Sequence, residues 1–108
     1  MICDVLGAEN NGTTIAAMNL IRSLKAKGHN LKVVCPDEDK RGQDGFYVVS
    51  KYNFGPLNSY VEKNGVSLAK PDEDILREAV TGADVVHILV PFALGHAAAE
   101  MATEMKIP

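Results

Sequence analysis

This chain of 108 residues has few cysteines and no large excess of charge of either sign. Each of these features excludes a class of protein. The two cysteines, Cys3 and Cys35, are too few for a disulfide framework and have no C-x-x-C spacing. We therefore expect two buried thiols in a reducing cytoplasm. The 11 basic and 14 acidic residues leave a net charge of −3. This balance excludes a strongly basic nucleic-acid footprint and gives no polybasic reason to bind an anionic membrane.

Long hydrophobic runs are missing as well. No apolar stretch of the sequence approaches the roughly 18–20 residues that cross a bilayer. No basic start followed by an apolar stretch and a small-residue cleavage site marks a secretory signal. We therefore expect a cytoplasmic protein. Apolar residues are still plentiful, at 46% of the chain, and the length fits one domain, residues 1–108, at roughly 100–200 residues per domain.

Short apolar runs alternate with segments of helical periodicity along the chain. The runs predict strands over residues 1–6, 31–35, 46–50 and 83–90. The last run is continuously apolar, which is typical of a strand covered on both faces of a sheet. After the last run, the start of another strand at Ile107-Pro108 would pair with it in the usual doubly wound order. Without that strand an apolar edge lies open, so we expect either a homodimer through this edge or a longer protein.

Three segments carry apolar residues at three- and four-residue spacing, which predicts helices that begin near Thr13, Pro71 and Leu94. Gly28 is well placed to cap the first helix at its C-terminus. The carboxylates of residues 72–74 suit the first turn of the second helix. The alternation predicts an α/β fold, a Rossmann-like parallel sheet with helices on both faces.

The loop from Gly7 to Gly12 lies between the first strand and the first helix, where α/β proteins hold phosphates. Its glycines have the P-loop spacing, but Thr13 stands where the phosphate-binding lysine must be, which disfavours an ATPase. The loop also has no G-x-G of a dinucleotide site. Asp37 occupies the usual place of a ribose-binding acid, but a polar residue that ends a strand is the commoner explanation.

Two sequence segments resemble a known family. Asp4, the loop with Asn11-Gly12 and the run 24–34 (LKAKGHNLKVV) look like the start of a retaining GT-B glycosyltransferase, family-four-like (glycosyl transferases group 1). The segment 82–95 is similar to that family's "aDvvHxHxPxxxG" pattern, although Leu89 replaces its second histidine. The two matches span nearly the whole chain in the correct order.

The resemblance implies a two-domain enzyme in which this chain is the truncated N-terminal, acceptor-side half and a C-terminal domain binds a nucleotide-sugar. Asn11, Gly12 and Thr13 would then face the donor diphosphate, where a side chain at residue 12 would crowd the phosphate. Alternatively, Gly12 only permits a tight turn before the helix. The residues that could line the cleft are Asp4, His87, Pro91 and Phe92.

No catalytic residue is assigned, because the family's catalytic histidine lies just past the strand that would begin at Ile107. We therefore expect the fragment alone to be inactive. No metal site is expected, because the three histidines lack metal-ligand spacing, and the resemblance implies no tightly bound cofactor in this chain. The donor would bind only with the C-terminal domain.

Other interpretations stay open at this stage. His87 is either a buried neutral histidine or a cleft residue, whereas His96 should face solvent and His29 should be structural. Aromatic residues near the irregular middle of the chain form either an acceptor platform or the packing under a loop: Tyr47, Tyr52, Phe54 and Tyr60. The competing functions are a free-standing, non-catalytic binding or dimerisation module and a small nucleotide-binding regulator.

Overall fold

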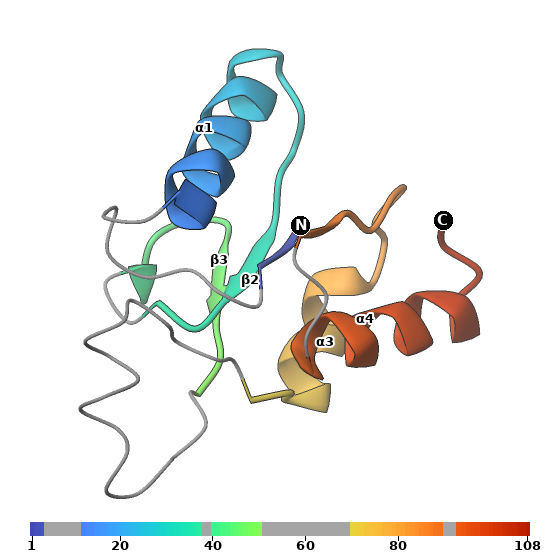
Figure 1. The fold of residues 1–108 in the computed structure, drawn as a ribbon. Coiled ribbons are helices and arrows are strands. Elements are labelled where there is room, and N and C mark those ends of the chain that lie inside the picture. The colour runs from blue at the N-terminus through green and yellow to red at the C-terminus, as the bar shows by residue number, and fades with distance from the viewer. Residues whose placement is uncertain (4–11, 38–39, 51–69, 90–92) are drawn as a thin grey trace, which may run out of the picture.

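The computed structural model describes residues 1–3, 12–37, 40–50, 70–89 and 93–108 (Figure 1). Within these residues the strands are β1 (Ile2–Cys3), β2 (Val33–Cys35), β3 (Phe46–Val48) and β4 (Ile88–Leu89). The helices are α1 (Gly12–Ala26), α3 (Glu73–Val80) and α4 (Ala93–Glu104).

The described strands form one parallel sheet in the order β3-β2-β1-β4. Ile2 of β1 lies opposite Val34 of β2 on one side and opposite Ile88 of β4 on the other. Strand order 3-2-1-4 is that of a doubly wound sheet, in which the chain moves outward from β1 and later returns to its other side. The predicted Rossmann-like α/β fold is confirmed.

Each face of the sheet carries its own core, because successive residues of a strand point to opposite faces. Ile2 and Val34 belong to the core under α3 and α4, to which these helices contribute Leu76, Ala79, Val80, Leu94, Ala98 and Met101. On the other face, β1 and β2 pack against α1 through Cys3, Val33, Cys35, Ala17, Met18 and Ile21. Figure 1 shows α1 apart from α3 and α4. The helices therefore cover both faces, as predicted.

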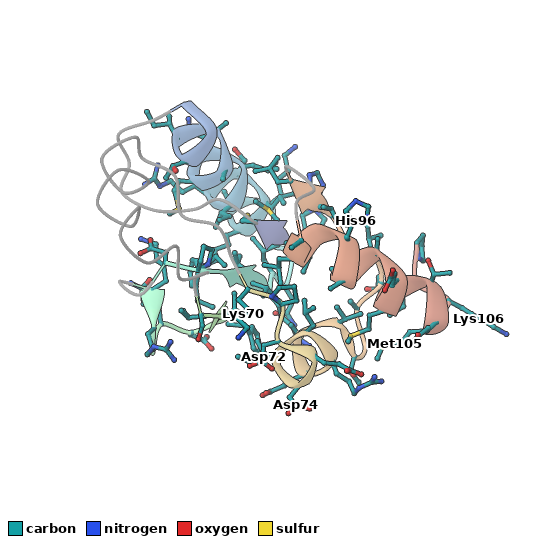
Figure 2. All side chains as sticks on the ribbon, turned by 60° about the horizontal axis from the view of Figure 1, so that its bottom comes forward. Lys70, Asp72, Asp74, His96, Met105 and Lys106 are labelled. Atoms are coloured by element: carbon teal, nitrogen blue, oxygen red, sulfur yellow. The ribbon has the colours of Figure 1, made fainter. Side chains whose placement is uncertain are left out.

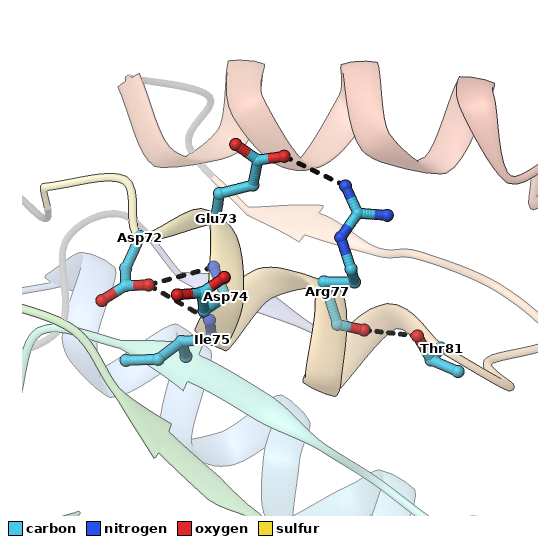
Figure 3. A network of polar contacts seen from close by, with 6 residues as sticks. All are labelled: Asp72, Glu73, Asp74, Ile75, Arg77 and Thr81. Atoms are coloured by element: carbon cyan, nitrogen blue, oxygen red, sulfur yellow. Dashed lines mark hydrogen bonds and ion pairs between the residues drawn. The ribbon is translucent and has the colours of Figure 1, made fainter.

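The predicted helix ends are also found. Asp72 caps α3, since its Oδ1 accepts from the backbone N–H groups of Asp74 at 3.1 Å and Ile75 at 3.2 Å (Figure 3). Gly28 follows α1 with φ at +85°, and its N–H donates to the carbonyl oxygen of Lys25 at 3.0 Å. A residue with a β-carbon is strained in that left-handed conformation, so the glycine ends the helix.

The strand predicted over 83–90 is much shorter and less covered than its apolar composition indicates. Only Ile88–Leu89 is regular strand among the described residues, and the side chain of Val85 is 64% exposed. The reason is position, because β4 lies at the edge of the described sheet. Val86 N–H donates to the carbonyl oxygen of Pro108 at 2.8 Å, so the chain end lies beside this edge, where the next strand was expected.

Candidate functional site

The site expected from the sequence lies where the strand order of the sheet reverses. β1 and β4 are neighbours, and Cys3 at the end of β1 pairs with Leu89 at the end of β4. The chain therefore leaves both strands at the same edge and continues into α1 after one strand and into α4 after the other. These helices cover opposite faces of the sheet. In open α/β sheets, ligands bind in the crevice at this kind of position, outside the carboxyl ends of the strands.

Gly12 is the first residue of α1 and is exposed at this edge. A β-carbon built on it meets no described residue within 4 Å, and its φ lies outside the left-handed region. The described part of the fold therefore gives no steric reason for a glycine at residue 12. A ligand that approaches the backbone closely would be a reason for a glycine at this position.

The first turn of α1 differs from that of α3 in charge. α3 begins with Asp72 as its cap and with Glu73 and Asp74 in its first turn, whereas α1 has no acidic residue in its first turn. The partial positive charge at the start of α1 is thus not offset by a carboxylate of that turn. This polarity suits an anion beside Gly12.

The other predicted site residues have different outcomes. Asp4, Asn11, Pro91 and Phe92 lie outside the described residues, as does the side chain of Thr13. Their place in the site stays a prediction.

His87 directly precedes β4 and is exposed, so its interpretation as a buried histidine is wrong. Its backbone oxygen accepts from the N–H of Ile2 at 2.7 Å, which holds β4 against β1. It lies two positions before Leu89, about 7 Å back from the carboxyl edge. A role in the cleft stays a prediction. His96 is exposed on α4 and points away from α3 (Figure 2), as expected.

Asp37 follows β2 and is buried, with 7% of its surface exposed. Its Oδ2 lies 3.7 Å from the ammonium nitrogen of Lys40, and its carbonyl oxygen accepts from the N–H of the same residue. These contacts with Lys40 give Asp37 a local structural role after β2.

The two cysteines are buried on adjacent strands of the sheet face under α1, and neither forms a disulfide. Burial raises the pKa of the Cys35 thiol to about 11, although a hydrogen bond with the backbone of Asp37 acts in the opposite direction. A thiol that stays protonated is a poor nucleophile. The expectation of a structural thiol at Cys35 is therefore consistent with its environment.

The described residues contain neither a candidate metal site nor a membrane-spanning helix. No group of three or more His, Cys, Asp or Glu residues there could hold a metal ion. No helix in the same part of the chain is long and apolar enough to cross a membrane.

Comparison with known proteins decides the family. The sequence model of Glycosyltransferase Family 4 matches residues 10–108. The chain belongs to this family. It is also 30% identical over 105 residues to a GDP-mannose-dependent alpha-mannosyltransferase of Corynebacterium glutamicum. That alignment covers 91% of this family 4 chain but only 24% of the relative, so the chain spans about a quarter of the relative's length. No solved structure matches.

One feature of this family 4 chain escaped the sequence analysis. A pocket of about 300 Å³ lies between the end of α1 and the segments that lead into β2 and β3. Polar side chains line it, among them His29, which the sequence analysis expected to be structural. The G-H-N run at residues 28–30 was noticed only as a family signature, and nothing in the sequence shows that residues 44–47 come beside it.

Proposed function

We propose that this family 4 chain is the acceptor-side, N-terminal domain of a retaining GT-B glycosyltransferase that transfers a sugar from a nucleotide-sugar to an acceptor. The observation that carries the proposal is the family match over residues 10–108, since it covers α1, β4 and α4 beside the strand-order reversal where a ligand would bind. The parallel sheet and the carboxylate-free start of α1 support it. The two buried cysteines support a reducing, cytoplasmic setting.

In this proposal the donor diphosphate lies against Asn11, Gly12 and Thr13. The open space at Gly12 admits a phosphate close to the backbone, and the N-terminus of α1 favours its charge. Asp4, His87, Pro91 and Phe92 contribute to the cleft wall. The chain alone transfers no sugar and holds no cofactor tightly, because the donor is held together with a C-terminal domain.

The relative that uses GDP-mannose makes this the first donor to test. The assay follows label transfer from GDP-mannose by the natural protein that contains this chain, with UDP-glucose and UDP-N-acetylglucosamine for comparison. Failure of the natural protein to transfer sugar from any nucleotide-sugar would refute the proposal.

Substitution at Gly12 tests the phosphate contact. Gly12→Leu fills the open space and should lower transfer by about tenfold or more, equivalent to at least about 1.4 kcal/mol. The matched control is Ala16→Leu, which adds similar bulk one turn further along the exposed side of α1. The control should keep its activity, and both variants should show the circular dichroism of the parent. Equal activity of the two variants would exclude the donor contact at Gly12.

The alternative function is a non-catalytic dimerisation module, favoured by the exposure of Val85 beside edge strand β4. A strand at the edge of a sheet can pair with a second copy through its free backbone groups. Light scattering of the chain distinguishes the two possibilities. A dimer that Val85→Lys converts to a monomer supports edge pairing, whereas a monodisperse monomer of the parent chain refutes it.

A further inference from the structure

We propose that the pocket at the end of α1 is a second ligand site, which binds a phosphorylated monosaccharide. Its walls come from three segments: the last turn of α1 with the residues after it, the residues before β2, and the residues before β3. The lining residues are Lys25, His29, Asn30, Leu31, Lys32, Asp44, Gly45 and Tyr47. The pocket's volume of about 300 Å³ lies at the lower end of the range for ligand sites, which suits a single sugar ring.

The pocket is at the opposite end of the sheet from the donor site. Residues 31 and 32 precede β2, and residues 44 and 45 precede β3, so both pairs lie at the amino ends of the strands. Lys25 is thirteen residues beyond Gly12 on α1, which places the two about 20 Å apart along the helix axis. A ligand in this pocket therefore does not occupy the proposed donor site.

Hydrogen-bonding groups around the pocket are largely unused. The side chains of His29, Asn30, Asp44 and Tyr47 make no hydrogen bond or ion pair with the described part of the protein. The ammonium of Lys32 donates to the carbonyl oxygen of Thr81 at 3.2 Å, which leaves two of its three protons. Polar side chains with spare hydrogen-bonding capacity around a pocket are what a polar ligand needs.

Donors outnumber anionic acceptors in the lining, and this sets the ligand's chemistry. Two lysines, Lys25 and Lys32, and one acidic residue, Asp44, line the pocket, and neither lysine has a carboxylate partner among the described residues. A phosphate monoester brings a charge of about −1.5 to −2 and three acceptor oxygens for such donors. The hydroxyl groups of a sugar ring would donate to Asp44. A sugar phosphate offers both kinds of group.

The negative end of α1 does not oppose an anion here. Three carbonyl oxygens of its last turns accept backbone N–H groups: that of Ser23 from Lys27, that of Leu24 from His29 and that of Lys25 from Gly28. These bonds, together with the Lys25 charge, offset the partial negative charge of the helix end. The Lys25 ammonium is held 5.0 Å from the centre of the Phe46 ring, at the start of β3.

Calorimetry on the chain tests the proposal with mannose 6-phosphate, mannose and inorganic phosphate as probes. Mannose 6-phosphate should bind saturably and about tenfold more tightly than either of the others, because only it presents both chemistries. Binding of inorganic phosphate with equal affinity would overturn the sugar-phosphate assignment. Absence of saturable binding at millimolar concentration would overturn the site itself.

Charge-matched variants locate the binding. Lys25→Gln and Lys32→Gln should each weaken mannose 6-phosphate binding by about tenfold, the loss expected for one charge-assisted hydrogen bond. Lys27→Gln changes the net charge equally but lies outside the pocket, and it should change the affinity by less than about twofold. Gly12→Leu should leave binding intact, so a failed glycosyltransferase assay and a failed pocket assay are distinguishable. Equal losses in Lys27→Gln and Lys25→Gln would refute the pocket as the place of binding.

Discussion

Gly45 lines the pocket at the end of α1, and its replacement by alanine should destabilise the chain through a clash with the backbone. Gly45 has φ at +82°, and a β-carbon built there would lie 2.9 Å from the backbone carbonyl oxygen of Leu31. Gly42 is the matched control, because its φ of +84° is nearly the same while nothing lies within 4 Å of the corresponding β-carbon. The two substitutions therefore share the backbone strain and differ in the clash.

The magnitudes follow from the geometry. A left-handed conformation costs alanine about 1–2 kcal/mol, partly offset by about 0.4–1 kcal/mol from the stiffer unfolded chain. Gly42→Ala should thus lower the free energy of unfolding by about 1 kcal/mol. At Gly45 the Leu31 carbonyl must also shift, beside the bond of 2.8 Å from Val33 N–H to the Gly45 oxygen. Weakening that bond adds about 1 kcal/mol, so Gly45→Ala should cost about 2 kcal/mol or more.

Urea unfolding followed by far-ultraviolet circular dichroism measures both variants against the parent chain. The slope of the free energy with urea should be unchanged, since both variants expose the same surface on unfolding. The reasoning is refuted if the two variants unfold at the same urea concentration, because the contact of the new β-carbon with the Leu31 carbonyl oxygen would then cost no stability.

Three further outcomes are expected from the same unfolding measurement. Asp72→Ala removes the cap of α3 and should cost about 1 kcal/mol, whereas Asp72→Asn keeps an equally good cap and should cost little. Leu76→Ala should cost about 2–5 kcal/mol because Leu76 is only 1% exposed, and an equal effect of Val85→Ala at the exposed edge would contradict the described core. Burial raises the pKa of Cys35 from 9.0 to about 11, so the thiol holds its proton more tightly in the folded chain than in the unfolded chain. The stability that the thiol contributes is therefore complete below pH 9 and is lost between pH 9 and 11, by up to about 2–3 kcal/mol. A Cys35→Ala variant with the same pH dependence would show that another group is responsible.

The fold was predictable because local signals and the sheet pattern agree. The cap at Asp72 and the turn at Gly28 depend on one or two residues each and lie where the sequence places them. The alternation of strand and helix then leaves the doubly wound sheet as the simplest arrangement. Local chemistry and topology point to the same structure.

Exposure was less predictable than fold. The run 83–90 is mostly apolar, yet Val85 is exposed, as is His87, because β4 lies at the edge of the described sheet. Apolar composition reports what a strand can bury, whereas its neighbours decide what it does bury. The pocket was unpredictable for a related reason. His29 and Asp44 are fifteen residues apart in sequence and meet only because β2 and β3 are adjacent and parallel.

The two ends of the sheet carry different chemistry, and this difference is itself an argument for two sites. At the carboxyl end, backbone N–H groups and open space beside Gly12 suit an anion, and the described part of the first turn brings no cationic side chain. At the amino end, the pocket supplies its charge through lysine side chains. Gly12→Leu should therefore affect donor use alone, and Lys32→Gln should affect sugar-phosphate binding alone. The two sites lie about 20 Å apart along α1, so the variants should act independently. If one variant disturbed both measurements, a single site would be the simpler explanation.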